Sequence, residues 1–396
     1  MKTPVSQTNT IITKEYLKTQ PENQYFEQKG KDTKPSKIAD ELIGMLNADG
    51  GILVFGVEDN GEISDLTLLG NKLDDYRKIV FDYIIPPCNI DLEEVFVDEK
   101  LIFIFHIEQD YERIFSRKDN EKVFLRVADS NRELNREQIR KLEYDKNIRH
   151  FEDEIIEDFE LEDLDNDLLE EYKSTVNYAA NPLDLLVKRY LANKKDGNYY
   201  FKKSAVLLFA KDPEKYIPSA SVRYIRYQGN QQKTGSEHNV IKDRRFENNI
   251  PNLIRELKDF LRNSLKNISY LDIETGKFVQ VPEYPEEAWL EGLVNALCHR
   301  SYNLQGNAIY IKHFDDYLEI SNSGPLPAQV TVENIKTERY ARNPRIARVL
   351  EDMGYVRQLN EGVARIYSSM EKFKLCEPEY REQNSTVYLT LRHRNK

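Results

Sequence analysis

Three side chains that could act on a metal-bound phosphate recur every four residues in one stretch of the chain. Glu291, Asn295 and His299 have this spacing, so a helix would stack them on a single face. An amide oxygen is a hard ligand that suits magnesium, and a carboxylate can take a proton from water. The spacing therefore predicts a metal–phosphate site, and the alternative is a solvated helix face that happens to carry these residues.

The residues around these three predict the helix that must position them. Pro285 is tolerated at a first helical turn, and the glutamates Glu286 and Glu287 suit the positive end of the helix dipole. A wide apolar stripe recurs at helical spacing, and its members are Trp289, Leu290, Leu293, Val294 and Leu297. We therefore predict one amphipathic helix over residues 285–300.

This stretch resembles the N-box of the GHKL ATPases, the superfamily of gyrases, chaperones and histidine kinases. It more closely resembles the divergent form that bacteria fuse to a Schlafen-type (AlbA-like) domain, with a pattern of roughly E-A-L-V-N-A-x-x-H-R-x-Y. The matching residues are Glu291, Val294, Asn295, Ala296, His299, Arg300 and Tyr302. The resemblance implies ATP as ligand, Asn295 as a magnesium ligand and Glu291 as the water-activating base, with His299 and Arg300 beside the nucleotide.

Two later segments resemble the same family. Asn322-Ser323-Gly324-Pro325 stands where GHKL proteins place the box that receives adenine, with Asn322 at the position of the usual acid. Arg342-Asn343-Pro344 matches the family's R-N-P before a helix. The resemblance implies Asn322, Gly324 and Arg342 as nucleotide contacts.

A third segment, from Leu359 to Ile366, stands where relatives have a G-T-G-I lid. Asn360 and Glu361 replace the first two residues of that motif, ahead of Gly362. One glycine that would let backbone amides approach a phosphate is therefore lost. Gly362 remains an implied nucleotide contact, whereas hydrolysis of ATP is left open. A GHKL-shaped scaffold that no longer binds ATP is the alternative.

The N-terminal third resembles the Schlafen-type domain along its length. The matching segments are E-x4-E-x-K (Glu22, Glu27 and Lys29), Asn47 to Gly61, and Phe124 to Leu134. The family binds nucleic acid, and in some members two glutamates at this spacing and an aspartate after the central strand form a metal-dependent RNase site. Carried over, the resemblance implicates Glu22, Glu27 and Asp59, with Glu58 as the alternative for the third position.

Such a site would be chemically reasonable. Three converging carboxylates can hold one or two divalent ions, Mg2+ or Mn2+, which activate water and neutralise charge at phosphorus. The alternative is that Glu22 and Glu27 are solvated and that Asp59 merely belongs to a hairpin turn. A phosphate-tracking surface is expected if the local basic residues lie together, and these are Lys29, Lys31, Lys34, Arg126 and Arg132.

Composition limits the other possibilities. The net charge of -11 leaves no global basic footprint for nucleic acid, so any such binding must use a local patch. The three cysteines are far apart, and the six histidines are scattered, which argues against a disulfide framework or a histidine zinc site. No apolar run reaches membrane-spanning length, so we expect a soluble cytoplasmic protein.

These observations predict an α+β protein of three parts. They are a Schlafen-type nucleic-acid-binding domain over residues 15–150, an acidic linker and connector over 151–245, and a GHKL-like ATP-binding domain of the Bergerat type over 246–396. The leading hypothesis is a nucleotide-responsive nucleic-acid-binding protein, a candidate Mg- or Mn-dependent effector that cleaves RNA or tRNA in stress or anti-phage defence. The alternatives are a non-catalytic DNA-binding regulator with ATP as allosteric ligand and an interaction scaffold with both sites degenerate. We also expect a homo-oligomer.

Overall fold

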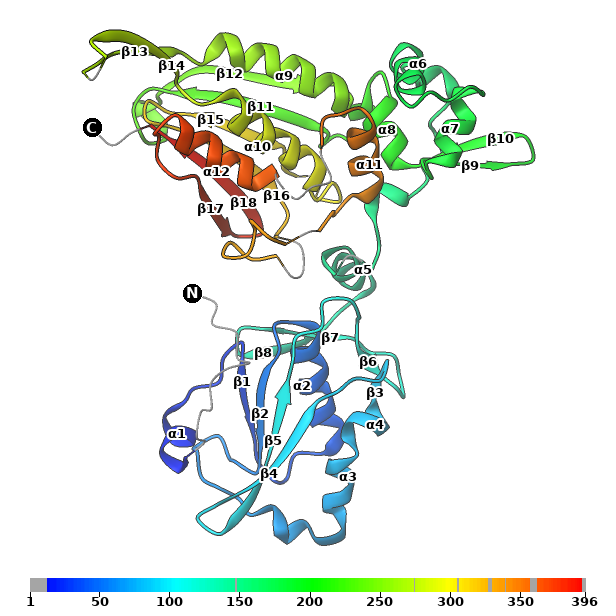
Figure 1. The fold of residues 1–396 in the computed structure, drawn as a ribbon. Coiled ribbons are helices and arrows are strands. Elements are labelled where there is room, and N and C mark those ends of the chain that lie inside the picture. The colour runs from blue at the N-terminus through cyan, green and yellow to red at the C-terminus, as the bar shows by residue number, and fades with distance from the viewer. Residues whose placement is uncertain are drawn as a thin grey trace. The chain divides into compact units, whose positions relative to one another are not determined.

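The chain divides into two compact units, Met1–Arg149 and His150–Lys396. The computed structural model describes residues 13–146, 148–273, 275–304, 306–326, 330–338, 340–356 and 362–393. Asn360 and Glu361, which the sequence places in a lid motif, lie outside the described residues. Each unit has its own sheet and helices (Figure 1), and the predicted α+β class is confirmed.

Unit 1, residues 1–149, is built on a four-stranded sheet in the order β1-β2-β5-β4. The strands are β1 (Phe26–Lys29), β2 (Gly51–Phe55), β5 (Lys100–Ile107) and β4 (Asp91–Val97). β1 runs parallel to β2, and the other pairs are antiparallel. Helix α2 (Pro35–Asn47) covers one face, where its apolar residues join those of β2 and β5 in one core.

Helix α2 begins at a proline and ends before a glycine. Its C-terminal turn stops at Gly50, which has a φ of 73° and whose amide donates to the Met45 carbonyl at 3.0 Å. Its N-cap is Lys34, and Pro35 is the first helical residue. Proline fits there because its missing amide would have had no helical partner.

The remaining elements of unit 1 are short. They are α1 (Lys14–Thr19), α3 (Leu73–Arg77), α4 (Ile79–Tyr83), β3 (Ile84–Ile85), β6 (Ser116–Arg117), β7 (Phe124–Val127), β8 (Ser130–Glu133) and α5 (Arg136–Asp145). β8 pairs with β7 from Ser130 onward, where Ser130 lies opposite Val127. This β7–β8 hairpin packs on α2, where Asn131 donates to the Asp40 carbonyl at 2.7 Å.

Unit 2, residues 150–396, contains a six-stranded sheet in the order β12-β11-β15-β16-β18-β17. Its strands are β11 (Ser221–Tyr227), β12 (Val240–Glu247), β15 (Ile309–His313), β16 (Tyr317–Ser323), β17 (Glu379–Gln383) and β18 (Thr386–Arg392). Only the β11–β15 pair within this sheet is parallel. β11 and most of β12 fall within the predicted connector, residues 151–245, yet they extend the sheet of the predicted ATP-binding domain.

Three helices cover one face of this sheet (Figure 1): α9 (Ile250–Ser264), α10 (Glu286–His299) and α12 (Gly362–Lys372). α10 contacts α9, α12 and β16. It lies close to the sheet at Gly292, where an added Cβ would be 2.5 Å from Leu389 Cδ2. The helix that carries the predicted site is therefore fixed against the strands.

The remaining helices and strands of unit 2 lie outside the six-stranded sheet and the three helices that cover it. These elements are α6 (Asn166–Thr175), α7 (Pro182–Lys188), β9 (Ala192–Lys195), β10 (Asn198–Phe201), α8 (Lys203–Phe209), β13 (Asn267–Asp272), β14 (Lys277–Pro282) and α11 (Pro344–Asp352). Within the predicted connector, residues 204–209 belong to the helix α8, and Ala210 caps its C-terminal end. No helix in the described part of the chain is both long and apolar enough to cross a bilayer.

Candidate functional site

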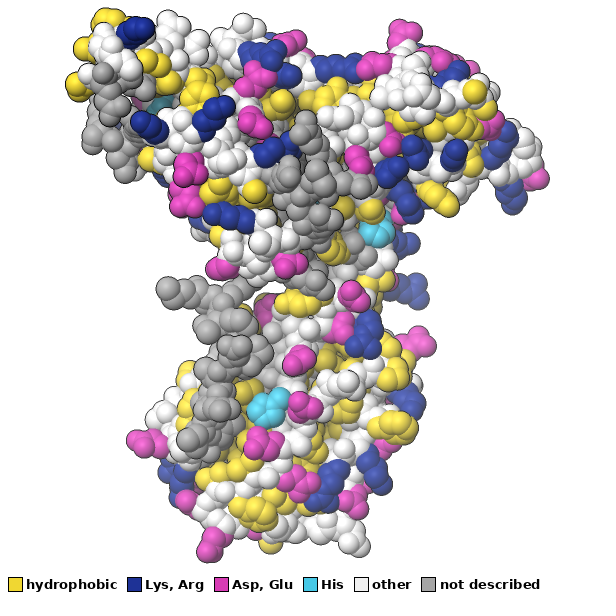
Figure 2. Space-filling model, in the orientation of Figure 1, with side chains coloured by type: hydrophobic (Ala, Val, Ile, Leu, Met, Phe, Trp, Pro, Cys, Tyr) yellow, Lys and Arg dark blue, Asp and Glu magenta, His cyan; other side chains and the backbone are white. Residues whose placement is uncertain are grey.

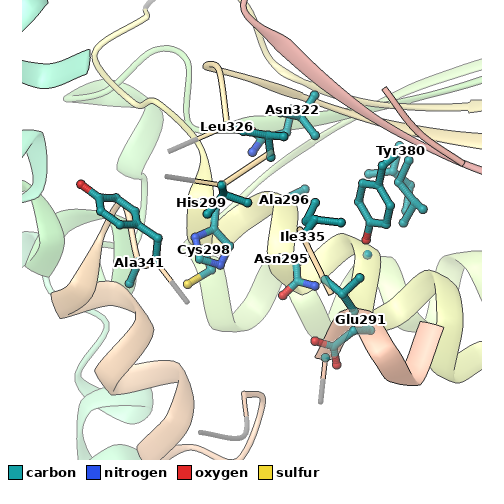
Figure 3. Close-up of a pocket in the computed structure, with 18 of the residues that line it drawn as sticks. Glu291, Asn295, Ala296, Cys298, His299, Asn322, Leu326, Ile335, Ala341 and Tyr380 are labelled. Carbon is teal, nitrogen blue, oxygen red and sulfur yellow. The ribbon is translucent and has the colours of Figure 1, made fainter. Parts of the chain in front are cut away.

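The predicted ridge of α10 faces a pocket in unit 2. Glu291, Asn295 and His299 all line this cavity of about 330 Å³ and point into it from the same helix (Figure 3). The opposite walls come from β16, β17, β18, α11 and the start of α12. The four-residue spacing therefore places these three side chains in one cavity, as the sequence predicted.

Glu291 is held at the junction of α10 and α12. Its Oε2 is 2.6 Å from Nη2 of Arg365, and the two side chains are 11% and 22% exposed. A Cβ at Gly362 would lie 2.3 Å from Glu291 Oε1, so the first turn of α12 needs glycine to approach the carboxylate. Burial raises the pKa of Glu291, while the charge of Arg365 and a hydrogen bond from Asn295 lower that pKa.

His299 lies at the end of this ridge as a neutral imidazole. Burial and, to a smaller extent, the charge of Arg342 lower the pKa of His299 to about 4. Its Nδ1 is buried and has no hydrogen-bond partner among the described residues. A neutral ring with an unused nitrogen can donate to or accept from a ligand, but it cannot supply positive charge to a phosphate at neutral pH.

Asn322 supplies a second unused polar atom, from the strand β16. The residue lines the pocket opposite α10 (Figure 3), and its Oδ1 is buried without a partner among the described residues. A buried acceptor without a donor is costly, and a ligand that donates there would remove that cost. The surrounding wall is apolar and includes Ile320, Leu326, Ile335, Val363 and Leu389.

Three of the predicted nucleotide contacts lie outside this lining, and two of them are arginines. Arg300 is fully buried and donates to the backbone carbonyls of Ser219 and Asn307. Arg342 donates to the Pro325 carbonyl at 2.8 Å. The structure thus uses both guanidinium groups to hold backbone, so the contacts that we predicted for them with nucleotide are not assembled here.

Asn343 and Gly324, which belong to the same motifs, also have structural roles. Asn343 donates to the carbonyls of Cys298 and Arg300 at 2.9 and 2.8 Å, which satisfies the C-terminal end of α10. Gly324 has a φ of 113°, and an added Cβ there would be 2.3 Å from Ser301 Oγ. Gly324 is therefore required by the backbone, next to a pocket that it does not line.

The lining residues suit a nucleotide at its base end. The cavity is at the small end of the range for ligand sites and has the usual apolar wall with a few convergent polar groups. An acceptor at Asn322 suits an exocyclic amino group, and the oxygens of Asn295 and Glu291 suit Mg2+. None of the described lining residues is lysine or arginine. Bound Mg2+ would supply the charge that stabilises the phosphates.

The predicted carboxylates of unit 1 are arranged differently. Glu27 Oε2 is 2.5 Å from Nη1 of Arg126, and these side chains are only 3% and 1% exposed. Arg126 also donates to the carbonyls of Asn23 and Phe26 at 2.9 and 3.2 Å. The prediction that Arg126 contacts nucleic acid is therefore wrong for this structure, since the residue joins β7 to β1 inside the unit.

The other two predicted carboxylates are placed differently from each other, because Glu22 shares Lys29 with Glu27 and Asp59 lies in a turn. Glu22 accepts a hydrogen bond from the Gln28 amide at 3.1 Å and lies 3.6 Å from Lys29, which also bonds Glu27. Asp59 is exposed in a turn closed by the Gly61 amide and the Glu58 carbonyl at 2.7 Å. The alternative third acid, Glu58, directs its carboxylate at Gly30.

These positions bear on the predicted metal site and basic surface. Within the described ranges, no group of three or more His, Cys, Asp or Glu side chains could hold a metal ion. The predicted trio of Glu22, Glu27 and Asp59 is therefore not brought together as a metal site. Of the predicted basic residues, Lys34 and Arg132 are exposed and Lys31 is half-buried.

The arginine partner of one lining residue could not be found from the sequence. Arg365 pairs with Glu291 from 74 positions away, and no spacing rule connects residues on two helices. The only signal was its place at the end of the lid-like stretch, three residues after Gly362.

Comparison with known families finds both predicted regions. Residues 22–135 match the family model described as "Schlafen, AlbA_2", and residues 306–391 match HATPase_c_4, described as "Putative ATP-dependent DNA helicase recG C-terminal". The predicted fusion of a Schlafen-type region with a divergent ATPase region is thus confirmed. The second match begins after α10, so the roles of Glu291, Asn295 and His299 rest on the geometry of the pocket.

Two solved structures are similar to this chain. One is a crystal structure of a protein from Corynebacterium diphtheriae, with 21% identity and a TM-score of 0.49, covering 93% of this chain and 75% of that one. The other is the N-terminal domain of an ATP-dependent DNA helicase RecG-related protein from Nitrosomonas europaea, with 13% identity and a TM-score of 0.23, covering 28% and 83%. No curated protein matches the chain.

Proposed function

We propose that this chain, which joins a Schlafen-type region to a divergent ATPase region, is an ATP-binding protein that acts on nucleic acid. The pocket of unit 2 is the nucleotide site. The observation that carries the proposal is that Glu291, Asn295, His299 and the unpartnered Oδ1 of Asn322 all line one cavity.

Each lining residue has a role in this proposal. Asn322 Oδ1 accepts a hydrogen bond from the exocyclic amino group of adenine, and the apolar wall holds the ring. Asn295 holds Mg2+, which neutralises phosphate charge when the nucleotide is bound. Glu291 is the base for water only when Arg365 releases it, because the ion pair occupies Oε2. Binding without rapid hydrolysis is the expected resting behaviour.

The nucleic-acid part of the proposal follows from the match of residues 22–135 to the Schlafen model. We predicted two modes, cleavage of RNA in stress or defence and non-catalytic binding with ATP as allosteric ligand. The Glu27–Arg126 pair favours the second mode, because a carboxylate that is 3% exposed has little access to a phosphate or a metal. The expected homo-oligomer stays a prediction.

Calorimetric titration of the full chain with ATP and with GTP, in magnesium, tests the nucleotide site. We expect saturable ATP binding, with weaker GTP binding because guanine presents an oxygen where adenine presents an amino group. Replacing Asn322→Asp keeps the acceptor and removes the donor, so it should widen the preference for ATP. Asn322→Leu should weaken ATP binding about tenfold, as loss of one buried hydrogen bond predicts. Equal affinity of all three proteins for ATP would contradict the proposal.

A further inference from the structure

The β9–β10 hairpin of unit 2 stands out from the acidic composition of the chain. Residues 188–203 contain six lysines or arginines and one acid, in a protein with a net charge of -11. The hairpin projects beyond α7 and α8 (Figure 1), and Figure 2 shows Lys and Arg side chains gathered over that end of unit 2.

The turn of the hairpin is tight and fixes which side chains share a face. Asp196 and Gly197 have φ values of 53° and 83°, as a two-residue turn of the hairpin class requires. The register pairs Lys194 with Tyr199, and Asn193 with Tyr200. Because side chains alternate along a strand, these two pairs lie on opposite faces of the ribbon.

One face is used to attach the hairpin to unit 2. Lys194 Nζ and the Tyr199 hydroxyl both bond the Asp184 carboxylate of α7, each at 2.9 Å. The Lys194 ammonium also lies 4.7 Å from the centre of the Tyr199 ring. These contacts hold the ribbon in place from its inner side.

The opposite face is exposed and carries no carboxylate. Its four members are Asn193, Lys195, Asn198 and Tyr200. Tyr200 is 43% exposed, and Lys195 makes no ion pair with any described residue. This outer face therefore presents one free cation, one aromatic ring and two amides on a rigid two-stranded ribbon.

The segment just before the hairpin adds groups of the same kind. Lys188, the last residue of α7, is exposed and lies 5.3 Å from the centre of the Tyr178 ring. Tyr190 is 63% exposed and has a φ of 60°, which directs the chain into β9. Lysines beside half-buried tyrosine rings thus occur on both sides of the exposed Tyr190.

We infer that the outer face of the β9–β10 hairpin binds single-stranded nucleic acid. Lys195 contacts a phosphate, Tyr200 stacks on an unpaired base, and Asn193 and Asn198 bond base edges or sugar. Basic grooves with stacking aromatics are the general means of binding single strands. The choice of nucleic acid as the ligand rests on the proposed function. The hairpin is then a nucleic-acid contact of unit 2, besides the contact proposed for the Schlafen-type region of unit 1.

Fluorescence anisotropy of a labelled single-stranded oligonucleotide with the full chain tests this assignment. We compare the wild type with Lys195→Glu, Tyr200→Ala and Tyr200→Phe. The matched control is Lys277→Glu, because Lys277 is an exposed lysine on the other two-stranded hairpin of unit 2. The three side chains replaced are all at the surface of a hairpin, and thermal melting verifies that the four variants fold.

The expected results are specific. Lys195→Glu and Tyr200→Ala each weaken binding about tenfold or more, while Tyr200→Phe and Lys277→Glu change it less than about twofold. Loss of the Lys195 contact also reduces the slope of log affinity against log salt by about one. Wild-type binding with no loss in the hairpin variants would overturn the inference and leave the proposed function intact. Absence of wild-type binding would overturn both the inference and the proposed action on nucleic acid. Equally tight binding of polyglutamate would also overturn the inference, because the partner of the hairpin would then be an acidic protein.

Discussion

Glu27 in unit 1 and Glu291 in unit 2 are both paired with an arginine, yet they are in very different surroundings. The Glu27–Arg126 pair is 3% and 1% exposed, and Arg126 also holds two backbone carbonyls. The Glu291–Arg365 pair is 11% and 22% exposed, and Glu291 lines a cavity of about 330 Å³. The first pair joins two strands, whereas the second borders an opening that a ligand can enter.

This difference shows why a motif alone does not establish a site. Both glutamates match family patterns at the expected spacing, but only one faces a cavity with unused polar atoms. Nδ1 of His299 and Oδ1 of Asn322 are buried without partners among the described residues. In the closed pair, Glu27 and Arg126 face each other away from solvent, whereas the open pocket leaves polar atoms that a ligand can reach and satisfy.

The largest effect that would test this contrast is the loss of the closed pair. Glu27→Ala should destabilise unit 1 by about 3–5 kcal/mol, because it leaves the Arg126 charge buried without its closest partner. Urea unfolding followed by circular dichroism measures the change. Fluorescence of Trp289, the single tryptophan, reports unit 2 in the same samples and should not shift.

Glu22→Ala is the control for this variant, because the Glu22 side chain is 38% exposed. It should cost no more than about 1 kcal/mol. A Glu27→Ala protein of unchanged stability that loses a metal-dependent RNase activity would instead make Glu27 catalytic.

A third buried carboxylate, Glu152, sharpens the comparison because its partners are amides rather than an arginine. It accepts hydrogen bonds from the amides of Arg345 and Ile346, at 2.7 and 2.9 Å, at the start of α11. Burial raises the pKa of Glu152 from 4.5 to about 7. At a pH between these two pKa values, Glu152 is protonated in the native state but largely ionised in the unfolded state. The free energy of unfolding of unit 2 should therefore fall as the pH rises.

The loss should total about 3 kcal/mol across this window. It is measured as the urea midpoint of Trp289 fluorescence at a series of pH values. Glu152→Gln cannot titrate and should flatten the dependence between pH 4.5 and 7. A wild-type midpoint that rises with pH in this range would contradict the assignment.

The open pair should respond more weakly than the closed one. Arg365→Ala should cost unit 2 about 1–2 kcal/mol, since Glu291 borders a cavity that can admit water. The pKa of Glu291, already raised by burial, should rise further once the Arg365 charge is lost. The stability loss should therefore grow with pH, and Arg365→Lys should restore part of it. A cost as large as that of Glu27→Ala would remove the distinction between the two pairs.

The smallest effect is expected at Asp59. Because its side chain is exposed in a turn and holds no metal cluster with Glu22 and Glu27, Asp59→Asn should change stability by less than about 0.5 kcal/mol. RNA binding should also be unchanged. A fall in divalent-metal affinity of this variant would show that the three acids do assemble.

The parts predicted from sequence were those fixed by local periodicity. The four-residue repeat of Glu291, Asn295 and His299 predicted one face of α10. Pro285 and the two glutamates that follow it predicted where this helix begins. Each of these depends on residues within one or two turns of each other, where rules of spacing apply directly.

The parts that could not be predicted depend on contacts between distant segments. The basic appearance of Arg126 gave no sign that Glu27, 99 positions earlier, and the carbonyls of β1 would bury it. Arg300 and Arg342 likewise matched nucleotide motifs but bond the backbone carbonyls of Ser219 and Pro325. A charged side chain can serve a ligand or the fold, and only its three-dimensional partners decide which.

Hydrogen exchange of the full chain with and without Mg-ATP tests the central claim most directly. Ligand binding stabilises the native unit by about 2.7 kcal/mol at a hundredfold excess over Kd. A nucleotide site in the pocket of unit 2 predicts slower exchange in α10 and α12, which meet at Glu291. It predicts no change in β1 and β7, which meet at Glu27 and Arg126. Slower exchange in unit 1 alone, or none anywhere at saturating nucleotide, would contradict it.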